Sequence, residues 1–271
     1  MKPKIAIIGD TCIDKTILGC VKRISPEAPV PIFTPLKETN TLGMAGNVFE
    51  NLKSLSMGEY DIDFYFDTGP SIVKTRFVDE ASGYMLLRVD ENDKQNPIRE
   101  SDLKKIKETD YKAVVISDYG KGFLSEENIR EISENCKTRN IPTFLDTKKY
   151  LYEWSKDITF VKVNQLEYER LLKNRKPNSY CQNLIVTKGG EGSTEVKTNI
   201  HVPGIKIEVR DPCGCGDTYL AALALAYLRL KDITVSSPIT TLNYIMHKAN
   251  QAAAICASHH GVVAVNGKLV W

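Results

Sequence analysis

The sequence predicts an α/β fold in which helices cover both faces of a mostly parallel sheet. Runs rich in β-branched residues alternate with helical patterns between about Ala113 and Thr187, and this alternation is typical of right-handed βαβ units. The first run, Lys4–Ile8, stops at Gly9 and Asp10, as a buried parallel strand does where it delivers the chain to a functional loop. With 271 residues, the chain is long enough to bury the core of one large domain.

Beyond the first strand, the N-terminal part reads as extended chain interrupted by one helix. From Cys20 to Leu42 the sequence is punctuated by prolines (RISPEAPVPIF), which exclude a helix and favour edge strands or a flap. Apolar residues recur at helical spacing from Ala45 to Leu55. Two extended runs, Ser71–Val78 and Tyr84–Val89, flank a glycine and predict a hairpin.

The rest of the chain continues the alternation of strands and helices. We expect strands at about Ala113–Ser117, Pro142–Leu145, Ile158–Val163 and Asn183–Thr187, short strands between Gly192 and Val209, and helices at about Arg99–Glu108, Ser125–Thr138, Gln165–Lys173, Gly214–Leu230 and Ser236–Ser258. These elements predict a single domain over residues 1–271, with a small flap formed by about 15–42 and 71–90.

Composition excludes several classes of function. The 36 basic and 34 acidic side chains leave a net charge of +2, so neither a nucleic-acid nor a membrane-surface partner is expected. The longest apolar stretch, Tyr219–Leu228, is half the length of the roughly 20 residues that a membrane-spanning helix needs. The N-terminus lacks a signal-peptide pattern, and the seven cysteines form no zinc-type cluster. We therefore expect a soluble, cytoplasmic protein.

The most informative motif is Asp211–Thr218, DPCGCGDT, which precedes an apolar helix. Gly214 and Gly216 let backbone amides approach an anion at the start of this helix. Asp217, in the first turn, is suited to act as a general base toward a hydroxyl that attacks phosphorus. Taken alone, the same residues also fit a helix cap preceded by a glycine turn. A metal-ligand role for Cys213 and Cys215 is disfavoured because no partner cluster accompanies them, and Cys215 fits a small-residue position.

Several motifs in the same order resemble the ribokinase-like (PfkB) carbohydrate kinases. They are GDTCIDK at 9–15, KVNQLEYERL at 162–171, LIVTKGGEGS at 184–193 and DPCGCGDTYLAALALAYL at 211–228. The resemblance implies a three-layer αβα sandwich with a mostly parallel central sheet, a β flap that acts as a lid, and ATP as the co-substrate. Mg²⁺ is implied as cofactor, and a monovalent cation is an optional addition.

Within that family, two further segments are similar to the kinase domain of bacterial enzymes that phosphorylate D-glycero-D-manno-heptose 7-phosphate. They are RISPEAPVPIF at 23–33 and VVISDYGKGFLS at 114–125. The resemblance implies transfer of the γ-phosphoryl group of ATP to the anomeric hydroxyl, giving the 1,7-bisphosphate. The alternatives are a kinase for another sugar, sugar phosphate or nucleoside, and a nucleotide-binding homologue that has lost catalysis.

The resemblance also implies a role for each matching residue. Asp217 corresponds to the catalytic base, and the amides of Gly214, Cys215 and Gly216 correspond to the anion hole. The nucleotide-side residues are Asn164 and Glu167, an N-x-x-E motif whose carboxylate organises Mg²⁺, together with Thr187, Lys188, Gly189 and Gly192 of the nucleotide loop and Asn250 near the adenine. The sugar-side residues are Asp10, Asp14, Gly43, Gly46 and Asn47. Asn164 and Glu167 equally fit a helix N-cap, and Asp14 equally fits a solvated loop.

The proposed hairpin carries three cations, Lys74, Arg76 and Arg88. If they face inward, they could bind the phosphate that the substrate already carries, for which arginine offers bidentate geometry. A solvated sheet edge is the alternative, because lysine and arginine are normal there. Exposed apolar residues such as those of the proline-rich segment favour association with another surface, which predicts a homodimer formed through the flap.

The chain departs from the family pattern in three places. The connection between Leu55 and Ser71 is short, which predicts a trimmed sheet edge. The chain ends at Trp271, where the family often continues with another helix, and it lacks the nucleotidyltransferase domain fused to some heptose kinases. Pro212 and Cys213 replace commoner hydroxyl residues, which leaves fewer side-chain donors for phosphate and predicts lower activity.

Overall fold

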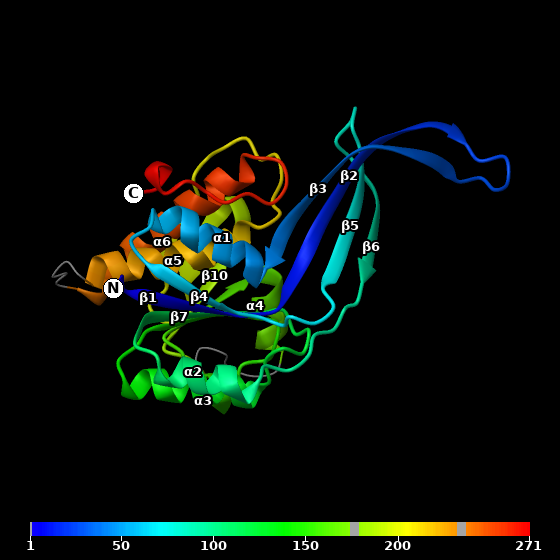
Figure 1. The fold of residues 1–271 in the computed structure, drawn as a ribbon. Helices are drawn as coiled ribbons and strands as arrows, with labels where there is room; N and C mark the ends of the chain where they lie inside the picture. Colours follow the sequence, from blue (N-terminus) through cyan, green and yellow to red (C-terminus); the bar gives the residue numbers. More distant parts are fainter. Residues whose placement is uncertain (1, 174–178, 232–236) are drawn as a thin grey trace.

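The main sheet is mostly parallel, as the sequence predicts. A computed structural model describes residues 2–173, 179–231 and 237–271 (Figure 1). The sheet has the strand order β12-β11-β10-β9-β8-β7-β1-β4, parallel from β4 to β10 and antiparallel at β11 and β12. Its strands are β1 (Lys4–Gly9), β4 (Asp61–Tyr65), β7 (Tyr111–Asp118), β8 (Thr143–Thr147), β9 (Phe160–Asn164), β10 (Asn183–Thr187), β11 (Gly192–Glu195) and β12 (Ile200–Pro203).

Helices cover both faces of this sheet. Along β1, Ile5 and Ile7 belong to the apolar core on one face, whereas Ala6 and Ile8 belong to the core on the other face, because successive side chains of a strand point to opposite sides. The first core is covered by α1 (Ala45–Ser56), α5 (Cys215–Lys231) and α6 (Pro238–Ala257), and the second by α2 (Glu100–Glu108), α3 (Glu126–Thr138) and α4 (Gln165–Leu172). Figure 1 shows α2 and α3 on the opposite side from α1, α5 and α6.

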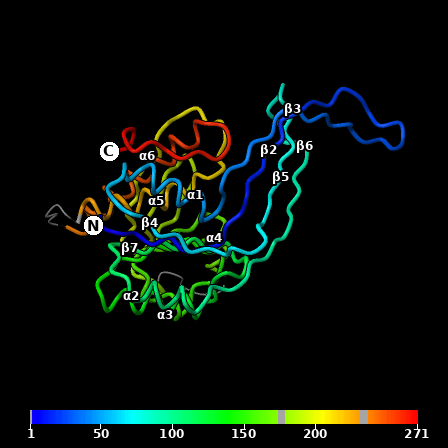
Figure 2. Tube along the Cα trace, viewed as in Figure 1, coloured from blue at the N-terminus to red at the C-terminus, as the bar shows by residue number. Residues whose placement is uncertain are grey.

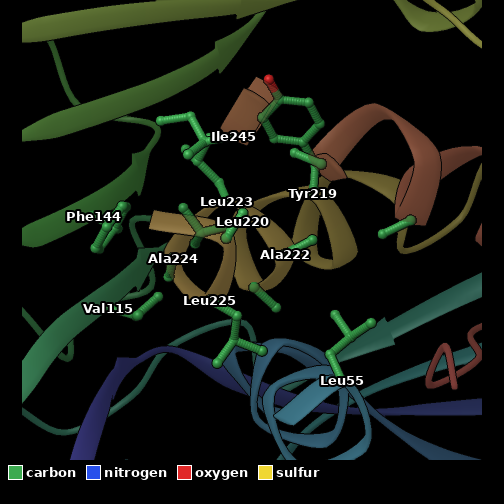
Figure 3. Packing of buried hydrophobic residues seen from close by; sticks show 14 of the residues in the cluster. Leu55, Val115, Phe144, Tyr219, Leu220, Ala222, Leu223, Ala224, Leu225 and Ile245 are labelled. Atoms are coloured by element: carbon green, nitrogen blue, oxygen red, sulfur yellow. The ribbon is translucent and has the colours of Figure 1, made fainter. Parts of the chain in front are cut away.

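The α5 helix is the centre of the larger core. Figure 3 shows its apolar side chains packed between Leu55 of α1, Ile245 of α6 and the sheet residues Val115 and Phe144. The run from Leu220 to Ala226 is fully buried, and each buried leucine there contributes roughly 1.5–3 kcal/mol relative to an exposed one. This packing fixes the N-terminal end of α5 beside the carboxyl ends of the parallel strands.

A second, four-stranded sheet projects from the body of the molecule, as Figures 1 and 2 show. Its order is β3 (Pro31–Met44), β2 (Thr11–Ile24), β5 (Ile72–Asp79) and β6 (Met85–Glu91). The hairpin predicted from the two extended runs is confirmed, since β5 and β6 pair antiparallel. Pro26 and Pro29 lie in the turn between β2 and β3, and Pro31 is the first residue of β3. The extended flap segment begins earlier than expected, at Thr11, because β2 pairs along its whole length with β3.

Two sequence-based expectations concern the edge of the main sheet and the start of the last helix. The short connection after Leu55 supplies a single edge strand, β4, whose Phe64 ring stacks on Phe49 of α1 at 4.8 Å. Between β4 and β5, no helix is formed. Ser236, expected as the first residue of the last helix, lies outside the described residues. Within the described ranges, none of the helices is long and apolar enough to cross a membrane.

Candidate active site

The centre of the site is Asp217, a buried carboxylate in the first turn of α5. The helix begins directly after Gly214, whose φ of 78° lies in the left-handed region that favours glycine. The Nδ2 of Asn47, on α1, donates to Asp217 Oδ2 at 3.0 Å, and the hydroxyl of Tyr119, which follows β7, donates to Oδ1 at 2.9 Å. The carboxylate is therefore held at both oxygens by two other parts of the fold.

Its surroundings make Asp217 a stronger base than an ordinary aspartate. Burial raises the pKa of Asp217 to about 6, and the nearby carboxylate of Asp146 adds to the increase, while hydrogen bonds from Asn47 and Tyr119 and the charge of Lys162 oppose it. At neutral pH the group is ionised, yet it binds a proton more readily than a solvated carboxylate does. A pKa close to the working pH is the condition that favours general-base catalysis.

Two lysines that sequence reasoning missed lie beside the anion-hole residues. Lys162 Nζ pairs with Asp146 Oδ2 at 2.7 Å in a buried contact, and a Cβ placed on Gly216 would come within 2.8 Å of that ammonium. Lys148 pairs with Glu167 and lies 3.6 Å from Asp146 Oδ1. Burial raises the pKa of Asp146, but the two ammonium groups outweigh burial and hold it below its ordinary value. The two ammonium groups thus balance the carboxylates of Asp146 and Glu167 beside the start of α5.

The N-x-x-E pair forms the helix cap that the sequence left open, and the magnesium role stays a prediction. Asn164 Oδ1 accepts from the Glu167 backbone N–H at 2.8 Å, and Glu167 Oε2 accepts from the Asn164 N–H at 2.8 Å, which is a capping box. The other oxygen, Oε1, faces the ammonium of Lys148. Since the cap uses only one oxygen, the second one is directed at the charged centre of the site.

Glu167 fits a magnesium site in which phosphates and water supply most of the ligands. Among the described residues, no group of three His, Cys, Asp or Glu side chains could hold a metal ion. Mg²⁺ usually retains several waters and binds one or two carboxylates together with substrate phosphates. The carboxylate of Glu167, with Oε1 on the side of Lys148, meets that requirement.

A cavity beside the start of α5 contains most of the predicted nucleotide residues. Thr187, Gly189, Gly192, Cys215, Gly216 and Asn250 all line it, together with Gly190, Gly204, Ile205, Ile207, Val209, Pro212, Tyr219, Ala253, Ala254 and Ala257. Lys188 is in the same loop but does not line the cavity. Asn250 Nδ2 donates to the Val202 carbonyl at 3.0 Å, so this amide ties α6 to β12. The mostly apolar lining fits one face of a flat aromatic base.

Cys215 and Cys213 are free thiols. The Cys215 side chain contacts the thiol of Cys256 on α6, and this contact lowers the pKa of Cys256 below its ordinary value. Cys256 in turn donates to the carbonyl of Cys213 at 3.6 Å. The cysteines therefore fasten the anion-hole segment to α6, in agreement with the expected packing role of Cys215.

The predicted sugar-side residues lie where β2, β3 and α1 approach Asp217, which Asn47 contacts directly. Asp14 on β2 pairs with Arg76 on β5, and Gly43 permits their close packing, since its Cβ would lie 2.0 Å from Asp14 Oδ2. Gly46 is likewise required by close packing, because its Cβ would meet that of Leu42 at 2.8 Å. Asp14 is buried rather than solvated, which removes the simpler interpretation of this residue.

The three hairpin cations lie on the second sheet in different surroundings. Lys74 Nζ is 5.7 Å from the centre of the Tyr119 ring, and therefore close to the base. Arg76 is only 21% exposed in its side chain, whereas Arg88 is 42% exposed and pairs with Asp90 at 2.7 Å. Lys74 and Arg76 are thus placed toward the site, and Arg88 is the most solvated of the three.

Asp10 holds the loop after β7, a structural role that the sequence did not predict. Its buried carboxylate accepts hydrogen bonds from the backbone N–H groups of Tyr119, Lys121 and Phe123. These contacts use both oxygens to shape the loop after β7. Direct contact with a sugar hydroxyl stays a prediction for Asp10, as it does for Asp14 and Asn47.

The chain matches known proteins over nearly its whole length. The model of the pfkB family of carbohydrate kinases matches residues 61–268. A protein of Campylobacter jejuni named bifunctional protein HldE is 32% identical over 302 residues, covering 98% of this chain and 63% of that protein. The HldE protein of Bradyrhizobium diazoefficiens is 28% identical over 309 residues, covering 97% of this chain and 61% of that protein. The chain thus spans less than two thirds of the length of these relatives.

Solved structures share the fold. The ribokinase of Arabidopsis thaliana, complexed with ribose and ATP, superposes with a TM-score of 0.72 at 14% identity, covering 100% of this chain and 98% of that one. Phosphofructokinase-2 from Escherichia coli, in complex with potassium, gives a TM-score of 0.72 at 15% identity, covering 100% and 97%. At these identities the likeness establishes the three-layer architecture.

Proposed function

The chain belongs to the pfkB family of carbohydrate kinases, and from this premise we propose that it phosphorylates the anomeric hydroxyl of D-glycero-D-manno-heptose 7-phosphate with ATP. The observation that carries the chemistry is the buried Asp217 at the N-terminus of α5, with a pKa raised to about 6. The sugar is suggested by the segments 23–33 and 114–125, which resemble heptose kinases. The HldE relatives, at about 30% identity, support the same choice.

In this proposal Asp217 takes the proton from the anomeric hydroxyl as its oxygen attacks the γ-phosphorus. A new O–P bond forms, the bond to the β-phosphate oxygen breaks, and ADP leaves. The amides of Gly214, Cys215 and Gly216, with the positive end of α5, stabilise charge on the transferring group. Lys162 and Lys148 add positive charge beside them. Because phosphoryl transfer needs little covalent work from a protein, positioning and charge account for the catalysis.

The cavity beside α5 is proposed to hold the adenine, with Asn250 and the 187–192 loop at its wall. Glu167 would hold Mg²⁺ and its waters, which when bound neutralise the phosphates and orient the γ-phosphoryl group. In this role Lys148 would exchange its pairing with Glu167 for the phosphates.

The phosphate already on the sugar is proposed to bind at the second sheet, which would act as a lid. Lys74 and Arg76 are the best placed cations, and Arg88 is available at the next strand. The same sheet leaves apolar side chains exposed along β3 and β6, among them Leu36 and Leu87 at 56% and 57%. Uncovered apolar strands favour association, so we propose a homodimer formed through this sheet.

An assay of ADP release over a panel of sugars and sugar phosphates tests the function. The expected result is turnover with heptose 7-phosphate that exceeds turnover with free heptose. Preference for a free sugar would reduce the proposal to an unspecified sugar kinase. Absence of turnover with every acceptor, in protein that binds ATP, would favour a nucleotide-binding homologue that has lost catalysis.

A further inference from the structure

The loop after β7 connects three parts of the site, although its sequence, SDYGKGF, carries no role in the mechanism above. Asp10, 1% exposed, accepts from the N–H of Tyr119 at 2.8 Å, of Lys121 at 3.1 Å and of Phe123 at 3.2 Å. The Asp10 N–H itself donates to the Ser117 carbonyl at 3.1 Å. A buried carboxylate that satisfies three backbone donors leaves the loop few other conformations, because each freed donor would be costly.

This fixed loop directs the phenol of Tyr119 at the base. The hydroxyl donates to Asp217 Oδ1 at 2.9 Å, while the ammonium groups of Lys148 and Lys74 lie 4.9 Å and 5.7 Å from the ring centre. Burial, followed by the negative charge of Asp217, raises the pKa of Tyr119 well above its ordinary value. The phenol therefore stays protonated at neutral pH, so that toward the ionised carboxylate it acts as a donor.

We propose that Tyr119 is a positioning residue for phosphoryl transfer, which orients the Asp217 carboxylate and keeps it ionised. The inference deepens the proposed function and rests on it. With Asn47 donating to one oxygen and Tyr119 to the other, the plane of the carboxylate is fixed toward the acceptor. Without the phenol hydroxyl, burial and Asp146 act on Asp217 with one opposing hydrogen bond fewer, and more of the base is protonated at neutral pH.

The variant Tyr119→Phe isolates this contact, because it removes the hydroxyl and keeps the ring beside which the two lysines lie. We expect kcat to fall about 10- to 100-fold, the range for a hydrogen bond to a charged group. The KM values for ATP and sugar should stay within about twofold. The acidic midpoint of the kcat profile should move above its wild-type value, because the lost bond favoured the ionised form.

A matched control is Tyr65→Phe, which removes a buried tyrosine hydroxyl at the far edge of the sheet, where it lies 2.7 Å from the Tyr111 hydroxyl. This change should lower the melting temperature without moving the acidic midpoint. If Tyr119→Phe behaves in the same way, with an unmoved midpoint, Tyr119 is merely structural and the proposal is wrong. Unchanged kcat in Tyr119→Phe would overturn it as well.

Two further measurements keep this inference separate from the proposed function. If the wild type phosphorylates no sugar, the function fails, but the Asp217 carboxyl can still be titrated by NMR with ¹³C-labelled aspartate. Its midpoint should be higher in Tyr119→Phe than in the wild type, and equal midpoints refute the positioning role. If Tyr119→Phe does not fold, fluorotyrosine at position 119 replaces it as the test. As a stronger donor it should lower the midpoint, and an unmoved or raised midpoint refutes the role.

Discussion

The replacement Asp217→Asn tests the assignment of the base through activity and stability together. The amide is close in size to the carboxylate but cannot accept the proton of the sugar hydroxyl. We expect kcat to fall by at least roughly 10²-fold, the lower range for general-base catalysis. The KM for ATP should change little, since Asp217 does not line the nucleotide cavity.

The stability change follows from the position of Asp217 in the fold. Folding raises the pKa of this carboxyl from 3.8 to about 6, so the native state binds more protons than the unfolded state between these values, and wild-type stability falls as pH rises through that window. Above the window the ionised group costs about 3 kcal/mol. The amide avoids this cost, but its single oxygen cannot accept from both Asn47 and Tyr119, a loss of about 1–3 kcal/mol.

The Asn variant should therefore equal or exceed the wild type in free energy of unfolding at pH 8, by up to about 2 kcal/mol. At pH 4 the wild-type carboxyl is protonated when folded, and the advantage of the variant should shrink or reverse. Denaturant unfolding at both pH values measures the difference, and a coupled ADP-release assay measures kcat. Near-normal turnover would refute the base, and a pH-independent stability difference would refute the raised pKa.

Three other changes test neighbouring parts of the site. In Arg76→Ala, kcat/KM for heptose 7-phosphate should fall roughly 10- to 150-fold, as expected for a charged contact, with a much smaller loss for free heptose; equal losses would show that Arg76 does not bind the substrate phosphate. In Gly216→Ala, the new Cβ would lie 2.8 Å from Lys162 Nζ, and kcat should fall at least about tenfold; near-normal kcat would show that the anion hole tolerates a side chain there. In Leu87→Asp, light scattering at micromolar concentration should report a monomer if the wild type is a dimer; a wild-type monomer would refute association through the lid.

The parallel sheet could be predicted because its strands are buried on both faces and therefore read as continuous β-branched runs. The strand β4 was missed because its sequence, DIDFY, is only five residues long and lacks a continuous β-branched run, so its polar–apolar alternation is a weak signal. Its place at the edge depends on tertiary contacts, namely the pairing of Lys4 with Asp63 at 3.1 Å and the stacking of Phe64 on Phe49. Neither contact is visible as a local pattern.

The candidate base and its glycines could be picked out from the sequence because they form one local motif, whereas the charges around them come from separate strands. Tyr119 follows β7, Lys148 follows β8, and Lys162 lies in β9. Adjacent parallel strands end at the same edge of a sheet, where ligands of open α/β folds bind. Polar residues at successive strand ends were therefore the available signal. It was weak, because a lysine or tyrosine after a strand is also common on an ordinary surface.

From the sequence, Glu167 fits either a helix cap or a magnesium ligand, and the two roles look exclusive because one side chain would have to serve both. In the structure, capping occupies Oε2, which accepts from the Asn164 N–H, and leaves Oε1 facing Lys148. Capping also fixes the orientation of the carboxylate, so the same bond that begins α4 directs the second oxygen toward Lys148. In the proposed function, the cap would therefore position the carboxylate that holds Mg²⁺. Helix-start motifs at the ends of parallel strands cannot be assigned to structure or function by sequence pattern alone.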